Sequence, residues 1–327
     1  MLSGIRQGAL RTVLMGSLVW ALLGGVVQGA PLEKIVYATT ATGGLGFLTD
    51  VIKRHRIDER HGITLDLKPF SPAEAEKATY YKKVDAGPFP LVSAVRVNAK
   101  GDRIRVFAPM LWSHFAILAR PGANIRTVEE LRGRRLASQE RITAGYNTAA
   151  LAFRMLGWDF EKSVRLVIGS PQVMMAWLQK GEVDSAIIFY PMAARGIAEG
   201  WAVELARLSQ IWERQTGGPL LTLGHAVHQD WLEARPDTAR RLARVFLDGQ
   251  RYVAAHPETV QESLKFLGAK SDREIDLLKK AMPTFYPTSW DRKGVEDAKL
   301  VLKKSMEFGI LENVPDKVLE DLFVILE

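Results

Sequence analysis

The sequence predicts an α/β protein with two lobes that face each other across a cleft. The main observation is a unit that occurs twice: Ser71-Pro72 begins a helical stretch that runs into Val84-Asp85-Ala86, and Ser170-Pro171 begins one of the same length that runs into Val183-Asp184-Ser185. Strand and helix patterns alternate in both copies, which is typical of a mostly parallel sheet covered by helices. The length of 327 residues also exceeds the usual size of a single core.

The first copy begins with a strand and a loop of small residues. Its expected elements are, in order, a strand over 34–37, a loop over 39–46, a helix over 47–60, a strand over 63–67, a helix that begins at Pro72 and a strand over 84–88. We expect the first helix to end at Gly62, because glycine favours the left-handed conformation with which many helices finish. Ser71, Pro72 and Glu74 match the capping box and the first-turn proline of a helix start.

The second copy has the same order of elements. They are a short helix between Thr127 and Gly133, a strand over 135–138, a helix over 144–156, a strand over 164–168, a helix that begins at Pro171 and stops at Gly181, and a strand over 183–189. On the helix after Pro171, the spacing of Met174, Trp177 and Leu178 places them on one face, which is typical of a core-facing side.

Two further apolar segments are candidates for strands that cross between the lobes. They cover Val106 to Ala119 and Leu220 to Val227, and the chain that follows is helical to its end. We therefore expect residues 30–111 plus 226–327 to form the first lobe with a C-terminal helical region beside it. Residues 112–225 form the second lobe.

The N-terminus resembles an export signal. Arg6 and Arg11 precede an uncharged run from Thr12 to Val27, and small residues follow at Gly29 and Ala30. This is the order of a cleavable secretory signal over residues 1–29. An uncleaved membrane anchor is the alternative, and the run is short of the roughly 20 apolar residues that a span needs.

The composition excludes several classes of protein. Cysteine is absent, so the chain has no disulfide framework, no thiolate metal site and no site for lipidation. With an export signal, this predicts a soluble protein of the bacterial periplasm. The net charge of +7 is spread over mixed-sign segments, which argues against a nucleic-acid partner. A mild preference for anionic small molecules remains compatible with it.

Catalytic signatures are absent from the sequence. There is no Gly-x-Ser-x-Gly elbow, P-loop or His-Glu-x-x-His. His225 and His228 have no acidic or histidine neighbour at metal-ligand spacing. The loop glycines at 43, 44 and 46 lack the third Rossmann glycine, since Thr49 holds that position. We predict no catalytic residue, no metal and no cofactor.

Two helix starts offer hydrogen-bond donors to a ligand. The glycine loop at 43–46 opens one helix, and Thr143 to Thr148, preceded by Arg141, opens the other. Glycines let backbone N–H groups approach a ligand, and the positive end of the helix dipole favours oxyanions. Ordinary helix capping is the alternative for each start.

Aromatic residues stand where several strands are expected to end. They are Phe89, Trp112, Phe189 and Tyr190, with Ser113 and His114 beside them. Such residues wall organic ligands in many clefts. Core or hinge packing is the alternative for each.

Three segments resemble a known family. They are Val128 to Ala137, Gly181 to Ala186, and Trp231 to Asp237 followed by Ala254 to Glu258. They are similar to the second-lobe entry, the strand before the cleft and the C-terminal helices of periplasmic substrate-binding proteins of ABC importers. The resemblance is to the group that serves nitrate, sulfonates, taurine and pyrimidine precursors of thiamin, and it covers nearly the whole mature chain.

The resemblance implies a two-lobed periplasmic-binding-protein fold of type II. It implies a monomeric receptor that closes on a small-molecule ligand by a hinge and delivers it to an ABC permease in the inner membrane. With Arg141 added from the helix start, the expected ligand-binding residues are Thr39, Thr40, Thr42, Gly43, Gly44, Pro88, Phe89, Trp112, Ser113, His114, Arg141, Thr143, Tyr146, Asn147 and Tyr190.

Two departures from the family pattern bear on the ligand. Lys82-Lys83 stands where the family usually has glycine, and Pro88-Phe89-Pro90 is stiffer than the usual small-residue turn. If Arg141 points into the cleft, the ligand is an anion, because guanidinium binds paired oxygens. If it points to solvent, an aromatic or neutral heterocycle held by Trp112 and Tyr190 is favoured.

Two alternative functions use the same fold. One is a ligand-sensing protein that signals to a membrane receptor. The other is an enzyme, but the enzymes that make the thiamin pyrimidine rely on a cysteine-rich motif that this chain lacks. The dehydratases of menaquinone synthesis are cytosolic, which the export signal contradicts.

Overall fold

The computed structural model describes residues 31–141 and 143–326. The predicted export signal, residues 1–29, lies outside the described residues. Within those residues, no helix combines the length and the apolar character that a membrane span requires. Leu32 to Glu327 belong to one compact unit.

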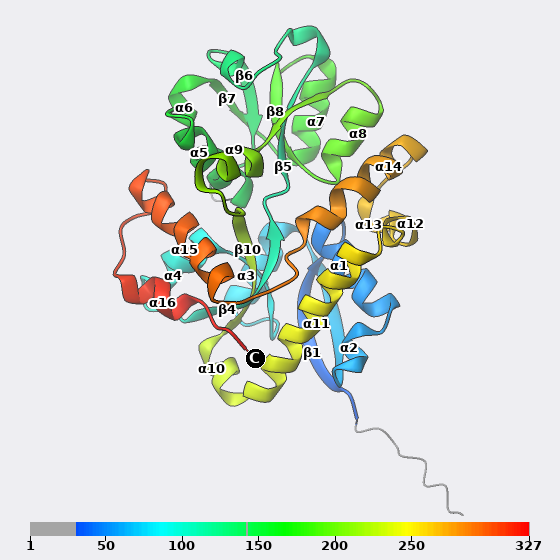
Figure 1. The fold of residues 1–327 in the computed structure, drawn as a ribbon, viewed down its shortest axis with the longest axis vertical. Coiled ribbons are helices and arrows are strands. Elements are labelled where there is room, and N and C mark those ends of the chain that lie inside the picture. Colours follow the sequence, from blue (N-terminus) through cyan, green and yellow to red (C-terminus); the bar gives the residue numbers. More distant parts are fainter. Residues whose placement is uncertain (1–30, 142, 327) are drawn as a thin grey trace, which may run out of the picture. The chain divides into compact units, whose positions relative to one another are not determined.

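Two groups of five strands with matching strand orders organise the fold (Figure 1). The strands of the first lobe are β1 (Glu33–Thr40), β2 (Ile63–Phe70), β3 (Gly87–Pro90), β4 (Ile104–Trp112) and β10 (Leu221–His228). Those of the second are β5 (Phe115–Ala119), β6 (Arg135–Ser138), β7 (Arg165–Ile168), β8 (Ser185–Phe189) and β9 (Val203–Arg207). We refer to these two groups, with the helices between their strands, as the first and second lobes.

The duplicated unit is visible in the strand orders. The second lobe has one sheet in the order β7-β6-β8-β5-β9. In the first lobe β1 pairs with β2, and β3-β10-β4 form a second group. A parallel bridge between Tyr37 and Ala86 joins the two groups. The strand order of the first lobe is therefore β2-β1-β3-β10-β4. The strand in fourth place, β10 or β5, runs antiparallel to its neighbours in each lobe.

The crossings between the lobes were predicted from the sequence as apolar strands. The outgoing segment divides into β4 and β5, with Ser113 and His114 between them, and β10 returns. The two segments meet at the junction, since Leu221 pairs with Trp112 and the Ser113 N–H donates to the Leu220 carbonyl at 2.8 Å.

The helices of the two copies also correspond. Those of the first lobe are α1 (Gly43–Arg54), α2 (Ile57–Arg60), α3 (Pro72–Tyr80) and α4 (Leu91–Asn98). Those of the second are η1 (Pro121–Ala123), η2 (Glu129–Leu131), α5 (Ala144–Met155), α6 (Phe160–Ser163), α7 (Pro171–Lys180), α8 (Met192–Ala198) and α9 (Leu208–Thr216). The capping box of Ser71 and Glu74 forms as predicted.

Two predicted elements of the first copy differ in the structure. The expected helix over 47–60 starts earlier, at Gly43, and is broken because Arg56 adopts a left-handed backbone with φ 51°. The expected strand at 84–88 shifts to β3, which pairs antiparallel with β10. Its Pro88 and Pro90 are compatible with this position, because β3 forms a ladder with β10 on one side and its other side meets β1 only at the adjoining Ala86 bridge.

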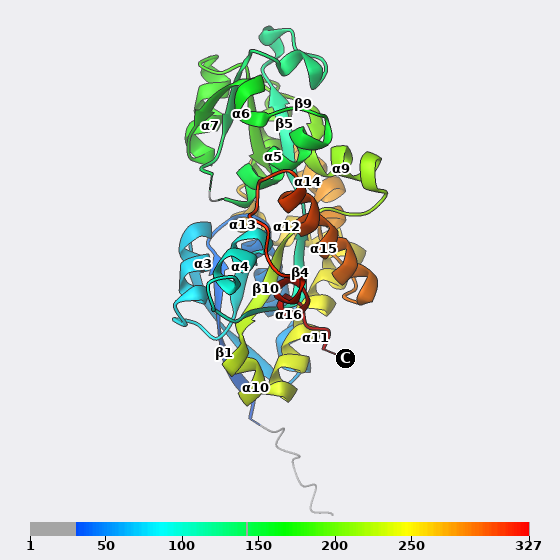
Figure 2. The same cartoon turned by 90° about the vertical axis from the view of Figure 1, so that its left-hand side faces the viewer.

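The C-terminal helices contact both lobes (Figures 1 and 2). They are α10 (Gln229–Ala234), α11 (Pro236–Ala255), α12 (Thr259–Glu262), α13 (Leu264–Leu267), α14 (Asp272–Ala281), η3 (Met282–Phe285), α15 (Arg292–Glu307) and α16 (Asp316–Leu322). Helix α11 packs on α1 and β4 as expected for a region beside the first lobe, and α14 also packs on α8 of the second lobe. One buried apolar cluster therefore extends from Phe47 through Met282 to Ile188.

Candidate ligand-binding site

The loop after β1 forms one side of the junction between the lobes. Thr40 Oγ1 accepts a hydrogen bond from the Gly46 N–H at 3.0 Å, and Thr39 Oγ1 lies 2.7 Å from Thr49 Oγ1. Thr42 is the N-cap of α1, but its exposed side chain makes no capping hydrogen bond and the first turn holds no acid. The first N–H groups of α1 therefore keep donor capacity for a ligand oxygen.

Gly43 and Gly44 bring this loop close to other parts of the chain. Gly43 has φ +88°, and a Cβ there would lie 3.9 Å from the Phe189 ring at the end of β8. The Gly44 carbonyl accepts a hydrogen bond from Tyr286 at 2.8 Å. The loop thus contacts the second lobe on one side and the C-terminal segment on the other.

A group of four rings lies beside the loop at the start of β5 and the end of β8. We call His114, Phe189, Tyr190 and Phe285 the aromatic group. The His114 ring centroid is 5.9 Å from that of Phe189 and 6.0 Å from that of Phe285, and Tyr190 and Phe285 are 5.4 Å apart. These separations are typical of interacting aromatic pairs.

The aromatic group carries little net charge near neutral pH. Burial lowers the pKa of His114 to about 4, so its imidazole is neutral at pH 7. Burial and the neighbouring Glu204 raise the pKa of Tyr190 to about 12. The Arg207 guanidinium lies 4.9 Å from the Tyr190 ring centroid and is neutralised by Glu204 at 3.0 Å.

Buried polar atoms at the same junction lack hydrogen-bond partners among the described residues. They are Ser113 Oγ and His114 Nδ1 between β4 and β5, Ser138 Oγ at the end of β6, and Thr222 Oγ1 in β10. Buried polar groups without partners are costly and uncommon. Their location at strand ends and crossings suits contacts with a polar ligand or ordered water.

The second helix start is organised around Glu161. Arg141 Nε donates to Glu161 at 2.7 Å, and the Tyr146 hydroxyl donates to the same carboxylate. The hydrogen bonds of Arg141 and Tyr146 lower the pKa of Glu161 to about 2. The Arg141 side chain is 64% exposed, so its charge is already paired at the surface.

The first turn of α5 is partly satisfied by its own side chains. Thr143 accepts a hydrogen bond from the Tyr146 N–H at 3.2 Å, and Asn147 Nδ2 donates to the Thr143 carbonyl at 2.8 Å. A Cβ at Gly145 would lie 2.8 Å from the Phe115 ring, and that ring stacks on His114. The turn therefore adjoins the aromatic group through Phe115.

Three predicted ligand contacts belong to a different cluster. Pro88 and Phe89 are buried in β3, and Phe89 belongs with Trp290 to an apolar cluster of the first lobe. Trp112 is half-buried and packs against the same cluster. For these residues the core-packing alternative has direct support from the contacts.

One small cavity lies among the residues of the junction, and a larger groove lies elsewhere. A cavity of about 20 Å³, lined by Asn147, Thr148, Thr222 and other residues of α4, α5 and α15, is close to the size of a single water. An open groove of about 540 Å³ lies elsewhere on the first lobe, lined by Tyr80, Tyr81 and His228 among others. The cavity beside Asn147 and Thr222 is therefore too small for an organic ligand.

Several residues of the junction were not identified from the sequence. Glu161, Glu204 and Arg207 neutralise or orient predicted residues, and Phe285 and Tyr286 reach the junction from the C-terminal segment. Phe285 and Tyr286 lie between Pro283 and Pro287, which indicates a loop. No local pattern indicates that Phe285 contacts Tyr190, about a hundred residues earlier.

The fold is similar to that of three solved binding proteins. The E. coli periplasmic aliphatic sulphonate-binding protein SsuA has a TM-score of 0.69 at 15% identity, covering 89% of this chain and 97% of that one. The Xanthomonas axonopodis alkanesulfonate-binding protein SsuA, solved with MOPS, has a TM-score of 0.68 at 14% identity, covering 87% and 96%. The Synechocystis nitrate-binding protein NrtA has a TM-score of 0.67 at 12% identity, covering 90% and 87%.

These neighbours have the periplasmic-binding-protein fold expected from the sequence, and they are binding proteins rather than enzymes. No curated protein matches the chain. Residues 51–268, two thirds of the sequence, match the NMT1-like family. The chain therefore belongs to the NMT1-like family.

Proposed function

We propose that the protein is a periplasmic solute-binding receptor that captures a small organic ligand at the junction of its lobes and delivers it to an ABC permease. The observation that carries the proposal is the set of buried polar atoms at the crossings, Ser113 Oγ, His114 Nδ1, Ser138 Oγ and Thr222 Oγ1. They lie among strand ends that face a second lobe of the same topology. Ligands of α/β sheets bind beyond such strand ends.

The charges at the junction favour one class of ligand. Arg141, itself a predicted ligand residue, and Arg207, which lies against the Tyr190 ring, are paired with Glu161 and Glu204. The remaining donors are backbone N–H groups of α1, hydroxyls and a neutral His114. Such a site suits a planar or aromatic molecule with a single oxyanion or carbonyl end better than a small inorganic anion.

Closure of the lobes completes the mechanism. A ligand that contacts both lobes stabilises only the closed arrangement, so binding shifts the protein towards it. The closed form then docks on the permease. We place the protein in the periplasm as a monomer, exported by the signal at residues 1–29.

A thermal-shift panel tests the function. The full-length chain is expressed in a bacterial host, purified from the periplasmic fraction and heated with aromatic carboxylates, aromatic and aliphatic sulfonates, taurine, pyrimidines, nitrate or bicarbonate. A ligand at 100 times its Kd stabilises the native state by about 2.7 kcal/mol, which raises Tm by about 4 °C for a chain of this length. We expect this rise with planar carboxylates, sulfonates or pyrimidines. If none of these classes raises Tm, the proposal is contradicted.

A further inference from the structure

The C-terminal segment contacts the second lobe through apolar packing and through one ion pair, in which Glu274 is buried and Arg195 is 34% exposed. We call residues 259–286, from α12 to the residue after η3, the bridging segment. The Arg195 guanidinium on α8 donates to the Gly268 carbonyl at the end of α13, and its Nε lies 3.6 Å from Glu274 Oε1 on α14. Glu274 is only 2% exposed, and its other oxygen accepts the Lys270 N–H at 2.9 Å.

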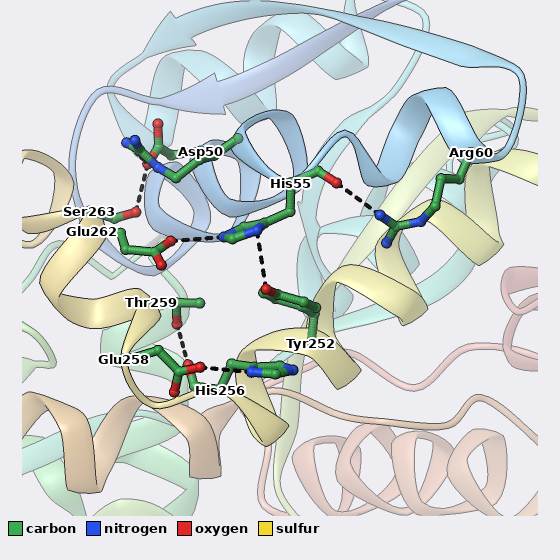
Figure 3. A network of polar contacts seen from close by, with 10 residues as sticks. Asp50, His55, Arg60, Tyr252, His256, Glu258, Thr259, Glu262 and Ser263 are labelled. Carbon is green, nitrogen blue, oxygen red and sulfur yellow. Dashed lines mark hydrogen bonds and ion pairs between the residues drawn. The ribbon is translucent and has the colours of Figure 1, made fainter.

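The bridging segment is anchored to the first lobe by a separate network (Figure 3). His55 at the end of α1 contacts Glu262 at 2.8 Å through Nε2 and the Tyr252 hydroxyl at 3.1 Å through Nδ1. Ser263 donates to Asp50 of α1 at 2.6 Å. These contacts tie α12 and α13 to α1, so the segment moves with the first lobe when the lobes separate.

Separation of the lobes would therefore break this contact with α8, together with the packing of Phe285 against Tyr190. Breaking it would leave the Glu274 carboxylate without its cation in a largely buried position. An unpaired buried charge is strongly unfavourable. The Gly268 carbonyl ends a helix, where the dipole also favours a cation, and it would lose the Arg195 guanidinium as well.

We propose that Arg195 and Glu274 form a latch that holds the second lobe against the bridging segment in the absence of ligand. The latch opens to admit a ligand and closes again behind it. Both residues are positioning residues, because they act through the lobes and do not contact the aromatic group. The inference rests on the proposed function only in linking the latch to ligand capture.

The absence of cysteine from the sequence makes a direct test possible. Lys77→Cys on α3 and Lys180→Cys on α7 place two spin labels at exposed positions, one on each lobe. Pulsed electron paramagnetic resonance then measures the distance between the lobes without any ligand. We expect the otherwise unchanged protein to show a short and a longer distance, because a ligand still shifts it towards the closed arrangement. We expect the share of molecules at the short distance to fall at least twofold in Arg195→Ala and in Glu274→Gln.

Matched variants separate the latch from a general loss of stability. Arg240→Ala removes an exposed ion pair with Asp237 within α11 and should leave the distance unchanged. Arg195→Lys keeps the charge and should restore part of the short distance. Glu274→Gln is nearly isosteric and tests the charge if Arg195→Ala fails to fold, which circular dichroism would reveal.

Two results would overturn the latch. One is an unchanged share of molecules at the short distance in folded Arg195→Ala and Glu274→Gln. The other is the absence of any short distance in the protein with native Arg195 and Glu274. The distance measurement uses no ligand, so a failure of the latch leaves the proposed receptor function intact. Conversely, a thermal-shift panel in which no compound binds leaves the latch result intact.

Discussion

The carboxylate of Asp85 accepts a hydrogen bond from the Val36 N–H at 2.8 Å, and the Asp85 N–H donates to the Val36 carbonyl at 2.9 Å. Asp184 repeats this arrangement with Arg135 at 3.0 Å for both contacts. In each copy the aspartate follows the corresponding helix, α3 or α7, and hydrogen-bonds to the first strand of the unit. The repeated Val-Asp dipeptide of the sequence thus has a structural reason.

We predict that Asp85→Ala destabilises the protein by about 1–3 kcal/mol. The substitution leaves the Val36 N–H and the Trp231 indole N–H, which also donates to Asp85, without that acceptor, and an unsatisfied buried donor costs this much. Urea unfolding measures the loss. The control is Asp66→Ala, which removes surface ion pairs with Lys34 and Lys68 and should change stability by less than about 0.5 kcal/mol. Equal losses in the two variants would contradict the assignment.

Gly46 in α1 and Gly145 in α5 should differ in their tolerance of alanine. A Cβ at Gly46 would lie 2.4 Å from the Thr40 backbone carbonyl, whereas one at Gly145 would meet only side chains, at 2.8 Å or more. We expect Gly46→Ala to cost about 1–3 kcal/mol, the range for overpacking, and Gly145→Ala to cost less, because side chains adjust more readily than backbone. A larger loss for Gly145→Ala in thermal unfolding would refute this ranking.

Arg141→Ala should change ligand affinity by less than about threefold. The guanidinium is paired with Glu161 and exposed, so it adds little attraction for a ligand, as is usual for surface ion pairs. Calorimetric titration of the compound with the largest thermal shift measures the effect. A tenfold loss confined to anionic compounds would show that Arg141 turns into the cleft when a ligand binds.

Two buried histidines should make the protein less stable in acid. Burial lowers the pKa of His114 to about 4 and that of His225 to about 3, below the ordinary value of 6.5. Below pH 6.5 the unfolded chain binds protons that the folded protein does not. The stability from a neutral His114, on the order of 3 kcal/mol, is therefore complete above pH 6.5 and lost as the pH falls to about 4.

His114→Asn removes this proton uptake from the unfolded state. We expect urea unfolding of the variant to depend less steeply on pH between 6.5 and 4 than that of the wild type. Identical slopes would mean that His114 is protonated in the folded protein at these pH values.

The sequence predicted the local parts of the fold because their signals are local. Ser71, Pro72 and Glu74 form the expected cap, and the repeat at 84–86 and 183–185 indicated two copies of one topology. The break at Arg56 was not predicted, because a left-handed backbone at arginine follows from the packing around it. The pairing of Arg141 with Glu161 depends on how α6 folds back on α5, which the spacing of the residues does not reveal.

The contribution of the C-terminal segment to the site was the largest gap in the prediction. Phe285 reaches Tyr190, and Glu274 reaches Arg195, across about eighty to a hundred residues of chain. The sequence indicated only that the chain after Val227 is helical, and it did not identify what α14 packs against. Contacts of this kind are determined by the tertiary arrangement and need the folded chain to be seen.

The most direct test of the receptor and its site is a calorimetric titration that compares two histidine variants. The ligand is the compound that stabilises the wild type most in the thermal panel, and the variants are His114→Asn in the aromatic group and His256→Asn, whose side chain is 42% exposed beside Glu258. We predict that Kd is at least tenfold higher for His114→Asn and unchanged for His256→Asn. Equal affinities for the two variants would contradict a ligand site at the junction of the lobes.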